Sequence, residues 1–145
     1  MHVSADINAS ATLEASDAPP GLRFLRAVLA AQVMLGMLWG ISMLFFASAI
    51  VLGDRSGPHI EKIAMEGGAH FTLVLGAILV WRFPREARLA LLMMIFLNAM
   101  WAVTDLVYIP LFALTAIDFG VKLVVNAALA VGLLVAGRRA RIIFS

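Results

Sequence analysis

Four long apolar stretches dominate this chain of 145 residues, and the first, from Ala27 to Gly53, runs for 27 residues without a charge. A helix of that length extends about 40 Å, which exceeds the hydrocarbon thickness of about 30 Å that a transmembrane helix crosses. Hydrophobic residues make up 63% of the sequence, whereas soluble domains are usually less than half apolar. We therefore expect an integral membrane protein.

Proline, glycine and charged residues divide the apolar sequence into four expected helices. Pro58 suits the first turn of a helix, while Pro84 and Pro110 are expected to end the helices that precede them. The expected fold is all-α, an up-down bundle of four transmembrane helices at about 22–53, 58–83, 86–109 and 111–137. Residues 1–20 are mostly small and polar and are expected to form a disordered tail, 21–141 the transmembrane domain, and 142–145 a C-terminal tail.

The basic residues are distributed unequally between the two ends of the expected helices. Only Arg55 and Lys62 fall at one end, whereas eight arginines fall at the other: Arg23, Arg26, Arg82, Arg85, Arg88, Arg138, Arg139 and Arg141. Cytoplasmic ends of membrane proteins carry an excess of basic residues. The pattern predicts a multi-pass protein of the cell (inner) membrane with both termini in the cytoplasm.

Three stretches also carry an ionisable residue 16 or 17 positions from one of these arginines: Glu66 before Arg82, Asp105 after Arg88, and Lys122 before Arg138. At 1.5 Å per helical residue, these separations are about 24 to 25 Å. The three side chains are therefore expected at one depth, inside the membrane near the extracytoplasmic side. Ionised groups facing lipid are costly, so the polar faces of the helices are expected to turn inward.

Helical spacing places further polar residues on the same faces, four or seven positions from these three. The expected ligand- or proton-binding cluster contains Glu66, His70, Trp101, Asp105, Asp118 and Lys122. Ser42, Asn98 and Asn126 are expected as interhelical polar residues, and Gly36 and Gly40 as a GxxxG packing face. Structural roles are open alternatives: an intrahelical Asp118–Lys122 pair, amides that only join helices, and a Trp101 that only packs.

Several classes of chemistry lack support in the sequence. Cysteine is absent, and His59 and His70 are about 16 Å apart along one helix, so neither a metal site nor a cofactor is expected. Nothing identifies a catalytic residue, since no GxSxG motif or phosphate-binding glycine loop is present. No basic segment with interleaved aromatics supports nucleic-acid binding.

Two functions fit these features. The preferred one is a ligand-binding or accessory subunit of a membrane complex, in which small-residue faces contact other membrane subunits or a second copy. The alternative is a small proton-coupled transporter, or a membrane enzyme, acting on a lipid-like substrate. In outline the chain resembles small four-helix bacterial membrane proteins of the DoxX-like type, a likeness of architecture over the whole length that no diagnostic motif accompanies.

Overall fold

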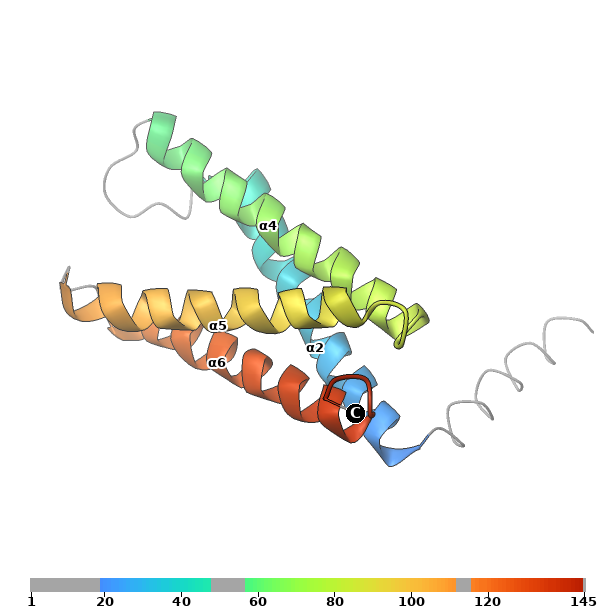
Figure 1. The fold of residues 1–145 in the computed structure, drawn as a ribbon. Helices are drawn as coiled ribbons and strands as arrows, with labels where there is room; N and C mark the ends of the chain where they lie inside the picture. Colours follow the sequence, from blue (N-terminus) through green and yellow to red (C-terminus); the bar gives the residue numbers. More distant parts are fainter. Residues whose placement is uncertain (1–18, 48–56, 112–115, 145) are drawn as a thin grey trace, which may run out of the picture.

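The computed structural model describes the backbone of residues 19–47, 57–111 and 116–144, and their side chains except at 57–59, 108–111 and 116–119. This part of the chain is all-helical (Figure 1). Its long helices are α2 (Pro20–Phe45), α4 (Gly57–Arg82), α5 (Arg88–Leu111) and α6 (Ala116–Arg139). By length and composition, all four are able to cross a membrane. The expected N-terminal tail before residue 19 lies outside the described residues, as do positions 48–53 of the first expected helix.

The helix ends follow the local sequence in part. The first helix, expected to continue to about residue 53, ends at Phe45, and the fourth, expected to begin at about residue 111, begins at Ala116. Pro20 opens α2, in the first turn, where a missing N–H costs no hydrogen bond. The third helix was expected to end at about Ile109, before Pro110, whereas α5 continues through Pro110 to Leu111. A proline in the last turn removes a single backbone hydrogen bond, so the helix is able to pass it by a residue.

The helices pack as two close pairs, α2 with α4 and α5 with α6, which contact one another between α2 and α6 and between α4 and α5. Glycines permit the closest approach. A Cβ atom added to Gly36 would lie 2.7 Å from Val74 Cγ2, and one added to Gly67 would lie 2.8 Å from the backbone nitrogen of Leu44. The GxxxG face of α2 is therefore covered by α4 of the same chain.

The two pairs lie close together at the arginine-rich end and spread apart toward the other end (Figure 1). The hydrophobic core occupies the closed half. Its members are Leu25, Leu29, Leu73, Ala77, Val80, Leu91, Met94, Leu133, Ala136, Ile142 and Ile143. Every core residue in a helix lies between the arginines and the level of Trp39, His70 and Trp101, so the open half is not filled by this core.

Outward-facing positions of the helices are mostly apolar. Within the most apolar window of each helix, only 22% to 33% of the residues are buried inside the protein. Met34, Phe45 and Leu89 are each about 70% exposed. Such a surface suits contact with acyl chains rather than with water.

The segment after α6, expected to be a tail, turns back onto the bundle. The N–H of Arg141 donates to the carbonyl of Arg138 at 3.0 Å, and that of Ile142 to the carbonyl of Gly137 at 2.9 Å. With Arg141 at φ 55°, these two bonds form a Schellman motif, which satisfies carbonyls left open at a helix C-terminus. The turn buries Ile142 and Ile143 in the core.

We expect Ile143→Ala to destabilise the protein by about 2 kcal/mol, because truncating a buried isoleucine leaves a cavity. Ile143 is 1% exposed and lies in the core cluster. Unfolding by sodium dodecyl sulfate in mixed micelles measures the effect. Leu89→Ala, at a position 71% exposed, is the matched control and should change little. Equal stability of the two variants would show that the C-terminal turn contributes no packing.

Candidate functional site

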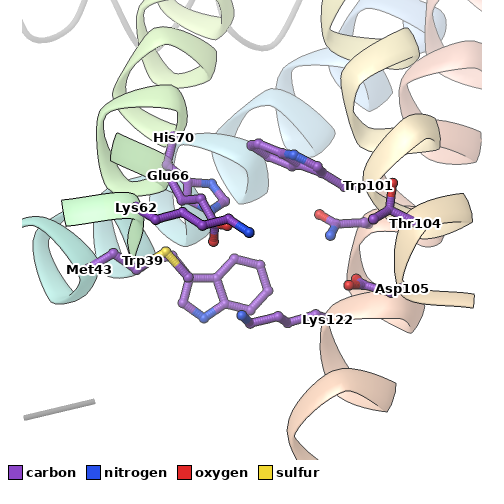
Figure 2. Close-up of a pocket in the computed structure, with 10 residues that line it drawn as sticks. Trp39, Met43, Lys62, Glu66, His70, Trp101, Thr104, Asp105 and Lys122 are labelled. Atoms are coloured by element: carbon purple, nitrogen blue, oxygen red, sulfur yellow. The ribbon is translucent and has the colours of Figure 1, made fainter. Parts of the chain in front are cut away.

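A cavity of about 560 Å³ lies between the two helix pairs in the open half of the bundle (Figure 2). All four helices contribute side chains to it: Trp39 and Met43 from α2; Lys62, Glu66 and His70 from α4; Trp101, Thr104 and Asp105 from α5; Lys122 and Asn126 from α6. The cavity exists because the pairs diverge where the apolar core ends. Its wall combines both charge signs with two indole rings.

An aromatic layer forms the inner end of the cavity. The His70 ring lies 4.7 Å from the Trp101 ring and 5.7 Å from the Trp39 ring, centroid to centroid, each tilted by 48°. Three different helices therefore contribute one ring each. His70 is 7% exposed, which places its imidazole at the boundary between the cavity and the apolar core.

Just beyond this layer, toward the arginines, two buried amides connect helices that otherwise barely touch. Asn98 of α5 donates from Nδ2 to Gln32 Oε1 of α2 at 2.9 Å, and also to the carbonyl of Met94 at 2.8 Å. Asn98 is 0% exposed and Gln32 2%, so water cannot replace these bonds. The amide pair fixes α2 against α5 directly beneath the cavity.

The opposite, charged end of the cavity contains the predicted acids and amine. Asn126, Lys122 and Glu66 all lie close enough to the Asp105 carboxylate to interact with it. Asp105 and Lys122 are half-buried, whereas Glu66 is exposed. Because α4 diverges from α5 here, Glu66 lies at the rim rather than in the bundle interior.

The structure brings six of the predicted polar residues to this one cavity: Glu66, His70, Trp101, Asp105, Lys122 and Asn126. Asn98 lies below it, as described, and the side chain of Asp118 lies outside the described residues. Ser42 is half-buried on α2 but does not line the cavity. Gly36 and Gly40 are buried against α4.

Five residues at or beneath the site were not predicted from the sequence: Gln32, Trp39, Met43, Lys62 and Thr104. Gln32 is the one strongly polar residue of the uncharged stretch 27–53, and this was the signal in the sequence for a buried polar partner. Thr104 is adjacent to Asp105, and Lys62 is one turn before Glu66. Nothing in the sequence distinguished Trp39 or Met43 from lipid-facing residues.

The arrangement suits non-covalent recognition. Indole faces offer large apolar contact surfaces that also attract cations, while the rim offers two carboxylates and two ammonium groups. Among the side chains that the structure describes, no group of three His, Asp or Glu is placed to hold a metal ion. No protein-family model, curated protein or solved structure matches this chain.

Proposed function

We propose that this chain is a small integral membrane protein that binds a small amphipathic molecule in the cavity between its two helix pairs. The observation that carries the proposal is the cavity itself, about 560 Å³ and within the usual range for small-molecule sites. Its polarity is graded from an aromatic inner end to a charged rim. A ligand with a planar apolar part and a polar head matches both ends.

The balance of charges at the rim favours a head group with little net charge. Glu66 and Asp105 are matched in number by Lys62 and Lys122, and Asn126 lies beside Asp105. A strongly anionic or cationic ligand would leave one pair of like charges without compensation in a partly desolvated site. We therefore propose a neutral or zwitterionic, lipid-like ligand.

The proposal includes the orientation in the membrane. With the eight arginines at the cytoplasmic side of the inner membrane, both termini lie in the cytoplasm and the cavity opens toward the extracytoplasmic side. An accessory role with other membrane subunits has less support than ligand binding, because α4 already covers Gly36 and Gly40. The apolar outer faces of the helices suit lipid as well as a partner.

Filling the cavity is expected to abolish binding. Thr104 lines it, and its hydroxyl donates only to the carbonyl of Met100 on its own helix. We expect Thr104→Trp to occupy the cavity, so that native mass spectrometry of gently extracted protein shows a bound small molecule for the wild type and none for the variant. Occupancy should fall at least about tenfold, since the ligand loses most of its contact surface.

Thr72→Trp is the matched control. Thr72 is also exposed, its hydroxyl donates to the carbonyl of Gly68 in the same way, and it lies outside the cavity. This variant should keep the ligand. A wild-type protein that is free of any adduct, or a Thr104→Trp protein that retains the adduct, would contradict the proposed function.

A further inference from the structure

We propose a second binding site, for the phosphate group of an anionic phospholipid, at the arginine-rich end of the bundle. A cavity of about 750 Å³ lies there, at the opposite end of the molecule from the polar cavity and sharing no residue with it. Three segments form it: the start of α2 from Pro19 to Leu22, the end of α4 with the following turn to Glu86, and the C-terminal turn from Arg139 to Ile142.

Four guanidinium groups line this cavity, those of Arg82, Arg85, Arg139 and Arg141, against the single carboxylate of Glu86. In the part of the chain that the structure describes, no salt bridge joins Glu86 to any of them. Arginine presents forked donors that bind phosphate oxygens in pairs. The cavity is therefore strongly complementary to an anion with several acceptor oxygens.

Packing of the start of α2 against the end of α6 brings the arginine cluster together. Gly21 contacts the last turn of α6 so closely that a Cβ added to it would overlap the carbonyl of Arg139 and lie 3.0 Å from the backbone nitrogen of Ala140. The Arg139 guanidinium lies over the Phe24 ring, 5.4 Å from its centroid. The Schellman turn then brings Arg141 to the same cavity.

The charge asymmetry that orients membrane proteins does not by itself account for this cluster. It favours basic residues anywhere near the helix ends, and Arg23 and Arg88 are exposed at the same end without lining the cavity. The cavity also includes Phe83, 51% exposed, which offers an apolar surface beside the arginines. Guanidinium groups next to an exposed aromatic ring fit a phospholipid better than a free anion.

The depth of the arginines in the membrane also favours a lipid phosphate as the occupant. The arginines flank helices long enough to span the hydrocarbon, so they lie at the level of the lipid phosphates whichever way the protein is oriented. Basic pockets between transmembrane helices are suited to anionic head groups. A volume of 750 Å³ holds a phosphoglycerol head group with room for the first carbons of an acyl chain.

Removing two of the arginines tests the site. Dioleoylphosphatidylglycerol is titrated into the purified full chain in dodecyl maltoside, and bound lipid is counted by native mass spectrometry. We expect Arg85→Gln/Arg141→Gln to weaken the apparent affinity by about tenfold or more, because each basic residue contributes separately to attraction of the anionic group. Both side chains are exposed, so thermal unfolding without lipid should be unchanged.

Arg23→Gln/Arg88→Gln is the control, because it removes the same charge from the same end outside the cavity. It should bind the lipid like the wild type. Equal losses in both double variants would overturn the site in favour of diffuse surface charge. Dioleoylphosphatidylcholine binding as tightly as phosphatidylglycerol would overturn anion selectivity, and inorganic phosphate alone displacing the lipid at millimolar concentration would overturn the lipid as occupant in favour of free phosphate.

Discussion

Gly67→Ala is expected to lower the free energy of unfolding by about 2 to 3 kcal/mol, one of the two largest effects predicted for this chain. The added Cβ would lie 2.8 Å from the backbone nitrogen of Leu44, 3.0 Å from the carbonyl oxygen of Gly40 and 3.1 Å from Met43 Cβ. None of these atoms is the end of a flexible side chain. Relief therefore requires α2 and α4 to move apart, which also displaces Glu66 at the cavity rim.

The next residue provides a matched control. Gly68 lies on the same turn, and nothing is within 4 Å of a Cβ added there. Gly68→Ala should therefore be neutral or stabilising by up to about 1 kcal/mol, the gain in helix propensity. Unfolding of both variants in mixed micelles gives the comparison. If Gly67→Ala were as stable as Gly68→Ala, the close crossing of α2 and α4 would be wrong.

The second large effect is expected at the buried amide pair. Asn98→Ala should destabilise the protein by about 2 kcal/mol, because it leaves Gln32 Oε1 without its donor and opens a cavity at a position with 0% exposure. The same unfolding assay measures the loss. The ligand adduct proposed above should weaken as well, since the pair lies directly beneath His70 and Trp101.

A double-mutant cycle separates the hydrogen bond from the packing. Gln32→Met and Asn98→Leu each keep the side-chain volume roughly constant. Gln32→Met leaves Asn98 Nδ2 with only its bond to the Met94 carbonyl, and Asn98→Leu leaves Gln32 Oε1 without its donor. The double variant removes both polar groups, together with Asn98 Oδ1, which is buried without a partner. We expect the double variant to be about 1 kcal/mol more stable than the sum of the single effects implies. Purely additive losses would mean that the two amides do not interact.

The sequence predicted the helices well because their signals are local. Hydropathy identifies four spans, and prolines and arginines place most of their ends within a few residues of the observed positions. The passage of α5 through Pro110 and the folded-back Ile142 and Ile143 were not predicted. Both depend on tertiary packing at a helix end, which helix signals do not report.

The common depth of the polar residues was also readable, because distance from an arginine anchor measures height along a helix. Distances from the arginines place Glu66, Asp105 and Lys122 at one level, and the structure brings all three to one cavity. Such distances along a helix contain no information on the angle between helices. The exposure of Glu66, and the contribution of Trp39 from a helix without charges, both follow from the divergence of the pairs.

The placement of the leucine-rich core on one side of the Trp39, His70 and Trp101 layer has a mechanical consequence. Pivoting one helix pair against the other about this layer would change the width of the cavity between the pairs. The leucine contacts on the arginine-rich side of the layer would be almost undisturbed. The packed core in the closed half would act as the fixed base of this movement. Any change in the width of this cavity would therefore appear as a change in the spacing of the helix ends at the open end of the bundle.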